Sequence, residues 1–321
     1  MSVNKPVDLS TLSHDYDYDF ELTPEYEATL PDLAEGDIKG SAIKIQKVGI
    51  SNFHLPLRIK TQRGETQELE ASIVGTVSLD AVKKGINMSR IIRTFYDYKN
   101  EIFDINKLGE VLTQYRERLG SYEATIYISF RYRIWQEALR TRDTQGNKNG
   151  GWQYYNITLE GNMDRDGTFE KIVHMDYVYS STCPCSTELA MHAIETRGQM
   201  ATPHSQRSVM RCSIKFDGFL WFEDILAALK RAIPTEVQVF VKRPDEQAFA
   251  ELNGSNRIFV EDAVRVVHRE FDIIPEIIDF RLVASHNESL HAHDAIAVLA
   301  KWVEGGFSDH ISPAELRSLV Y

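Results

Sequence analysis

The sequence predicts an α+β fold in which two tandem units share the element order ββααββ. Segments rich in β-branched and aromatic residues predict the strands. Between them, apolar residues recur at intervals of three and four, which predicts helices. The pattern occurs twice, and a chain of 321 residues is long enough for two such units.

The first unit begins with two strands joined by a polar turn and ends with two strands joined by a Gly- and Asn-rich loop over residues 141–151. Its four predicted strands are Ile45–Lys60, Glu68–Leu79, Glu123–Trp135 and Trp152–Glu160. Two helices are predicted between them. One covers Met88–Tyr98, and the other starts near Asn106 with its apolar residues at helical spacing.

The second unit repeats this order. Its predicted strands are Phe169–Ser180, Gln206–Phe216, Glu276–Ser285 and Ala292–Trp302. Helical periodicity runs from Phe222 to Ile233 and again from Phe259 to Phe271. Residues 236–242 predict an extra strand or an extended link between these helices. We place the boundary near residues 161–168, which gives units at 39–164 and 165–321 after an arm at 1–38.

The net charge of −11 is concentrated at the N-terminus. Residues 1–38 carry ten acidic side chains against one basic one, a balance of −9, so the rest of the chain lies near −2. We expect a flexible or loosely packed arm. Its aromatic residues could dock on the rest of the chain or on a neighbouring subunit. An acidic chain with no basic stripe argues against a nucleic-acid partner, but not against an anionic small molecule.

The composition predicts a cytoplasmic protein. Three cysteines do not form a disulfide framework, which favours a reducing compartment. No apolar run approaches the roughly 18 residues that span a bilayer, so no membrane partner is expected. The first residues lack the order of charged and apolar segments found in signal peptides.

The segment Cys183-Pro184-Cys185 is the first candidate site. Pro184 disfavours the α region for the residue before it, so Cys183 is expected to be extended. In an extended segment both thiols face one side, which suits two metal ligands or one ligand beside a reactive thiol. The alternative is two small buried side chains. His204 follows at a spacing that matches no compact zinc knuckle, although ligands from different strands need no fixed spacing.

Three further clusters carry candidate chemistry. Residues 242–247 predict either a solvated loop or a site in which Glu246 is an oxygen ligand and Lys242 or Arg243 contacts an anion. Glu261 lies where a helix is predicted to begin, and the helix dipole favours its ionised form. A carboxylate there could accept the paired N–H donors of a guanine edge. Residues 286–293 hold three histidines and a glutamate, which are either surface groups or a metal ligand and proton shuttle.

These clusters occur in an order that resembles the type IB family of GTP cyclohydrolase I. The resemblance covers residues 45–302 and rests on VGISNFHLP (48–56), KGINMSR (84–90), STCPCS (181–186), HSQR (204–207), KRPDEQ (242–247), FVED (259–262) and NESLHAH (287–293). It implies the tunnelling fold (T-fold), in which ββααββ modules assemble into a barrel. It also implies a homotetramer whose active sites lie between neighbouring subunits.

The resemblance also implies a role for each matching residue. The implied metal ligands are Cys183, His204, Glu246 and His291, where His291 is a fourth ligand or an acid/base group. The implied catalytic residues are Cys185 as a reactive thiol, His291 and the proton carrier Glu288. The implied substrate contacts are Glu261 for guanine, with Arg207, Arg90 and Lys84 for the triphosphate. The residues alone leave open which of the two cysteines is the ligand.

The implied activity is hydrolysis of GTP to 7,8-dihydroneopterin triphosphate and formate by water that a divalent metal (Zn, Mn or Fe) activates. This is a hydrolase reaction at a cyclic amidine, and it feeds folate or deazapurine biosynthesis. Two alternatives are a tunnelling-fold nitrile reductase with a Cys nucleophile and a non-catalytic zinc-binding protein. One departure from the family is the long spacer between Cys185 and His204. We expect it to affect the geometry around Cys185.

Overall fold

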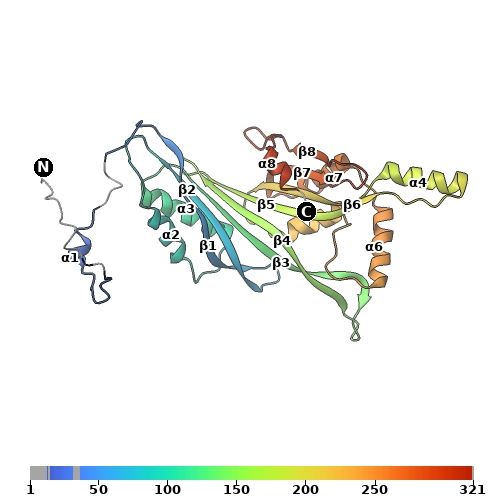
Figure 1. Cartoon of the computed structure of the whole chain (residues 1–321), viewed down its shortest axis with the longest axis horizontal. Coiled ribbons are helices and arrows are strands. Elements are labelled where there is room, and N and C mark those ends of the chain that lie inside the picture. The colour runs from blue at the N-terminus through green and yellow to red at the C-terminus, as the bar shows by residue number, and fades with distance from the viewer. Residues whose placement is uncertain (1–12, 14, 32–36, 320–321) are drawn as a thin grey trace.

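The computed structural model describes residues 13, 15–31 and 37–319, so part of the acidic arm lies outside the described residues. Within this range, one eight-stranded antiparallel sheet forms the centre of the molecule (Figure 1). Each strand pairs only with its neighbours in the sequence, in the order β1 to β8. The strands are β1 (Ile45–Lys60), β2 (Thr66–Leu79), β3 (Ala124–Arg142), β4 (Lys148–Met163), β5 (Phe169–Thr182), β6 (Ser205–Phe216), β7 (Ile277–His286) and β8 (Ala295–Ala300).

The helices are α1 (Pro24–Glu27), α2 (Met88–Asp97), α3 (Ile105–Leu119), α4 (Pro184–Arg197), α5 (Phe222–Ala232), α6 (Arg243–Ser255), α7 (Val260–Asp272) and α8 (Pro313–Arg317). The first half has the predicted ββααββ order, whereas the second half has two further helices, α4 between β5 and β6 and α6 between α5 and α7. The helix pair α2 and α3 follows β2, and α5 and α7 follow β6. The mixed α and β architecture predicted from the sequence is therefore confirmed. None of the helices in the described ranges is long and apolar enough to cross a membrane.

Three local predictions differ from the structure. The hairpin loop at 141–151 is shorter than expected, because β3 and β4 extend into it as far as Arg142 and Lys148. Of the two alternatives for residues 236–242, the extra strand is wrong, because Glu236 makes only an isolated bridge to Tyr179, and the segment is a link between α5 and α6. The solvated loop considered for residues 242–247 is instead the start of α6, where Pro244 occupies the first turn. Proline is tolerated there because the first-turn N–H groups have no partner within the helix.

The hydrophobic core lies between the helices and one face of the sheet. Helix α7 illustrates the pattern, because Val260, Ala263, Val264, Val267 and Phe271 are all buried at helical spacing. They meet alternate residues of the strands, which point to the same side of the sheet. This packing fixes the start of α7 relative to the end of β7, and pairing with β7 fixes the start of β6.

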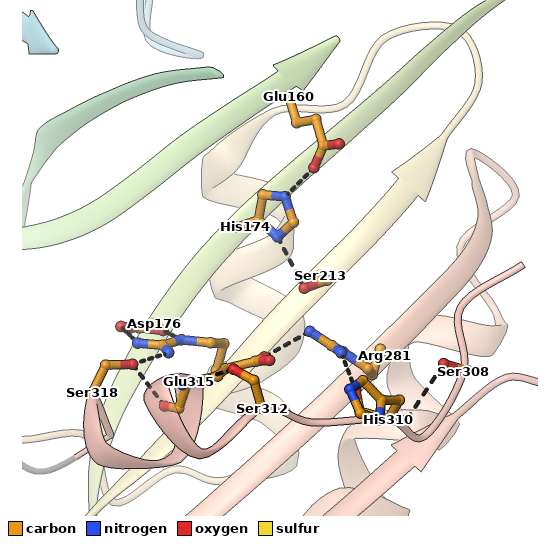
Figure 2. A network of polar contacts seen from close by, with 11 residues as sticks. Glu160, His174, Asp176, Ser213, Arg281, Ser308, His310, Ser312, Glu315 and Ser318 are labelled. Atoms are coloured by element: carbon orange, nitrogen blue, oxygen red, sulfur yellow. Dashed lines mark hydrogen bonds and ion pairs between the residues drawn. The ribbon is translucent and has the colours of Figure 1, made fainter. Parts of the chain in front are cut away.

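The other face of the sheet carries polar side chains and the C-terminal segment (Figure 2). His174 bridges Glu160 at 2.8 Å and Ser213 at 2.9 Å. Arg281 donates to Glu315 of α8. Leu319 is buried nearby against a small apolar cluster on the same face. The two faces are therefore chemically distinct. Of two neighbouring residues on a strand, one points to the core and the other to the polar face.

Candidate active site

A cavity of about 390 Å³ lies where β5, β6, α7 and β7 end or begin. Six of the residues singled out in the sequence line it, although they come from segments far apart in the chain. They are Cys183, Cys185, His204, Glu261, Glu288 and His291. Packing of α7 against β7, which pairs with β6, brings these segments together. The cavity is the candidate active site.

The two cysteines enter the cavity at the junction of β5 and α4. Cys183 is extended, with φ −67° and ψ 122°, as Pro184 predicts. Cys185, however, lies in the first turn of α4, so the expectation that strand alternation aligns the two thiols is wrong. The segment turns into a helix because Pro184 suits its first position and the Cys183 thiol accepts from the Ser186 N–H at 3.5 Å. Both cysteines line the cavity by way of this helix start.

Helix α4 accounts for the long spacer between Cys185 and His204. It projects from the end of the sheet (Figure 1). Ala190 is its one buried residue in the described range. Gly198 ends the helix in the left-handed conformation, with φ 61°. The chain then returns to the body at His204, whose N–H donates to Ser186 Oγ at 3.2 Å.

His204 is held by two acceptor groups beside one ring nitrogen. Its Nδ1 is hydrogen-bonded to Oε1 of Gln206 at 2.9 Å, and the Glu288 carboxylate lies beside the same nitrogen, with Oε2 at 3.4 Å. Gln206 is fixed in turn, because its amide donates to Ser181 Oγ at 2.7 Å. Two acceptors on Nδ1 place the proton there and leave the lone pair on Nε2. Histidines that ligate metals are usually held in this way.

Glu261 and His291 complete the rim. Glu261 lies in the first turn of α7. His291 lies in the loop between β7 and β8, where its ring stacks on that of His293 at 4.8 Å. Glu288, from the same loop, has a side chain only 14% exposed. The cavity thus combines two thiols, imidazoles and carboxylates in one small space.

Two further residues line the cavity, Gln206, to which sequence reasoning gave no role, and His286, which it named only as one of the three histidines of residues 286–293. His286 ends β7 and is 2% exposed, and its Nε2 lies 2.9 Å from the hydroxyl of Tyr179. Burial lowers the pKa of His286 to about 4, so the ring is neutral near pH 7. The sequence did carry a sign that His286 is buried, because this residue directly follows an apolar predicted strand.

Glu246, Arg207, Arg90 and Lys84 do not line the cavity of a single chain. Glu246 is exposed in the first turn of α6. Arg207 neighbours Gln206 on β6 and therefore points to the opposite face of the sheet. Arg90 lies in the first half of the chain, where it donates to the carbonyl of Arg118 at 2.8 Å. A motif in the sequence does not specify which face of an element a residue occupies.

The described residues contain no group of three or more His, Cys, Asp or Glu arranged to hold a metal ion within one chain. The donor chemistry of the cavity nevertheless fits such an ion. The Cys183 thiol and His204 Nε2 are ligand types that zinc and iron accept. The acceptors on His204 Nδ1 give this ring the orientation and tautomer that a ligand requires.

Comparisons with known proteins agree on one family. Residues 30–297 match the family model described as type I GTP cyclohydrolase folE2. GTP cyclohydrolase FolE2 of Paracoccus denitrificans is 52% identical over 294 residues, which cover 90% of this chain and 89% of the relative. GTP cyclohydrolase FolE2 of Roseobacter denitrificans is 50% identical over 299 residues, covering 91% and 80%.

A solved structure shares the fold at much lower identity. Uricase from Arthrobacter globiformis superimposes with a TM-score of 0.52 and 10% sequence identity, covering 83% of this chain and 96% of the uricase. At this identity the likeness concerns the arrangement of the sheet and helices alone.

Proposed function

Because this chain belongs to the type I GTP cyclohydrolase folE2 family and is a GTP cyclohydrolase, we propose that the cavity between β5, β6, α7 and β7 is its active site. The reaction is hydrolysis of GTP to 7,8-dihydroneopterin triphosphate and formate, the first step of tetrahydrofolate or deazapurine biosynthesis. One observation carries the assignment. Thiols, imidazoles and carboxylates from four separate sequence motifs share one cavity of about 390 Å³.

Cys183, His204, Glu246 and His291 would hold a divalent metal. Such an ion, zinc, manganese or iron, supplies a water molecule activated for attack at neutral pH. Cys183 and His204 share the cavity in one chain, and His291 lies on its rim. Glu246 would join them through a shift of α6 or from a neighbouring subunit. The mixed S, N and O ligand set suits each of these metals.

The other residues of the cavity act on the substrate. The Glu261 carboxylate accepts hydrogen bonds from N1–H and the 2-amino group of guanine, which fixes the base. The Cys185 thiol contacts the five-membered ring beside the carbon that leaves as formate. Glu288 and His291 carry protons between water and the ring nitrogens. Glu288 would do so while its Oε2 lies 3.4 Å from His204 Nδ1.

The working form is a homotetramer in which T-fold units close into a barrel. Within the described residues, the sheet has β1 and β8 as unpaired edges. Pairing of these edges between copies would satisfy their free backbone groups and close the sheet. Units at 39–164 and 165–321 would then lie side by side around the channel. This assembly would bring Arg90 and Lys84 of one subunit, together with Arg207, toward the triphosphate bound by another.

A turnover assay with controlled metal content tests the proposal. The metal-stripped protein is incubated with GTP alone, with EDTA, and with zinc or manganese, while formate and a fluorescent pterin are followed. We expect both products only when metal is present. Cys185→Ala is expected to abolish turnover and to leave the circular dichroism spectrum unchanged. Equal turnover by stripped and loaded protein would contradict the metal-dependent mechanism.

A further inference from the structure

A buried histidine and tyrosine form a hydrogen-bonded pair at the cavity. His286 ends β7 and lines the cavity, while Tyr179 lies on β5 and is 0% exposed. His286 Nε2 and Tyr179 Oη are 2.9 Å apart, and the rings meet edge to face at 5.7 Å. Neither residue lies within the seven motifs that carry the family resemblance, and no individual role follows for either from them. The pair therefore calls for a separate account.

The direction of this hydrogen bond follows from burial. A buried phenol needs an acceptor for its proton, and His286 Nε2 is the one hydrogen-bond partner that the described part of the chain gives to the Tyr179 hydroxyl. Tyr179 therefore donates, Nε2 accepts, and the proton of the neutral imidazole lies on Nδ1. Nδ1 has no hydrogen-bond partner among the described residues. A residue that lines the cavity consequently carries a fixed N–H donor on an uncharged ring.

The neighbouring Glu261 supplies the complementary group. Its carboxylate accepts hydrogen bonds, which matches the N1–H and 2-amino donors of guanine. On guanine, the acceptor O6 is attached to the carbon beside N1. A donor in the same cavity as Glu261 would therefore meet O6, whereas adenine presents an amino group at that position.

We propose that His286 is a further substrate-contacting residue, which donates from Nδ1 to O6 of guanine and, together with Glu261, makes the cavity select guanine. The inference rests on the proposed function and extends it by naming the group that recognises the 6-position of the base. Tyr179 is the positioning residue, because its hydroxyl fixes the tautomer of His286.

Equilibrium binding to the metal-stripped, full-length protein tests this without turnover. The ligands are GTP and 6-thio-GTP, which keeps both donors for Glu261 but replaces O6 with sulfur, a weaker acceptor. The wild-type protein is expected to prefer GTP by about tenfold. His286→Phe should bind GTP more weakly and lose this preference. His286→Asn should retain most of it, because the amide Nδ2 can donate from a position close to that of Nδ1.

His310→Phe is the matched control, because His310 is exposed and lies on the opposite face of the sheet (Figure 2). It should leave both affinities unchanged. If the wild-type protein binds no GTP, the proposed function itself fails. If it binds GTP and His286→Phe keeps the same affinity and the same preference, the inference about His286 is overturned. Should His286→Phe fail to fold, loss of the preference in a folded His286→Asn protein would also overturn it.

Discussion

Nδ1 of His204 lies 3.4 Å from Oε2 of Glu288, although the two residues are separated by most of the second half of the chain. Gln206 shares the same nitrogen from 2.9 Å. The contact joins the start of β6 to the loop after β7, so it exists only once the sheet has formed. Its consequence is chemical, because the orientation of His204 determines which ring nitrogen faces the cavity.

Replacing Glu288 with Gln should weaken metal binding as well as turnover. The amide removes the negative charge beside His204 Nδ1, and loss of such a partner typically costs about 10- to 100-fold in metal affinity. Competition with a chromophoric chelator measures the affinity directly. Glu304→Gln is a suitable control, because Glu304 is exposed and does not line the cavity. Unchanged affinity with lost turnover would restrict Glu288 to proton transfer.

The two cysteines of the cavity should respond differently to substitution. Cys183→Ala is expected to lower the bound metal to background, whereas Cys185→Ala should keep the metal and lose turnover. Elemental analysis of the purified proteins, together with the pterin assay, separates the two effects. Cys212→Ala should keep both properties, because Cys212 is buried in the core and does not line the cavity. The reverse pattern would exchange the roles of Cys183 and Cys185.

Much of this fold could be read from residue patterns, because its strands and core helices alternate or repeat regularly. The predicted bounds of β1 match the structure, and the periodicity in α7 identifies its buried face. Helix α4 could not be found in this way. Its apolar residues follow no single stripe, and almost none of it packs against its own chain. The long spacing between Cys185 and His204 indicated an insertion, but it did not indicate a helix.

The candidate site was partly predictable for a similar reason. Motifs that lie at element ends, such as Cys183 and Glu261, do meet in the cavity. The role of Asp245 was missed, because a charged cluster around a proline gives no sign of which carboxylate is buried. Asp245 is 1% exposed and accepts from the N–H groups of Arg140 and Thr141. It anchors α6 to β3, while its neighbour Glu246 is exposed.

Asp245→Asn should therefore destabilise the protein in a pH-dependent way. Burial alone would raise the pKa of Asp245, but hydrogen bonds from the Thr141 hydroxyl and from backbone N–H groups outweigh it and hold the pKa well below its usual value. The amide of Asn would direct N–H groups at the Thr141 hydroxyl or the Lys242 N–H, which now donate to Oδ2. We expect a loss of about 1–3 kcal/mol at pH 7.

The sign of the pH dependence follows from the lowered pKa of Asp245. The pKa of an unfolded Asp is about 3.9. A carboxylate whose pKa is lower in the folded state stabilises the protein fully above that value. This contribution is lost as the pH falls below it. Urea unfolding at pH 7 and at successively lower pH should show the gap between wild type and Asp245→Asn shrinking below about pH 4. Asp309→Asn, at an exposed position, should show no comparable gap. A gap that stays constant down to pH 2 would contradict this account.

Gly198→Ala tests how α4 is terminated. Gly198 has φ 61°, and its N–H bonds to the carbonyl of Ile194 at 2.9 Å, while space around it is open. Because a Cβ is disfavoured in this conformation by about 1–2 kcal/mol, the end of α4 should fray. Hydrogen exchange of amides 194–200 should become faster.

Gly254→Ala is the matched control, since Gly254 lies inside α6 without positive φ and with open space around it. That change should slow exchange in α6 by favouring the helix by about 0.5–1 kcal/mol. If both substitutions leave exchange unchanged, the left-handed cap does not limit the stability of α4.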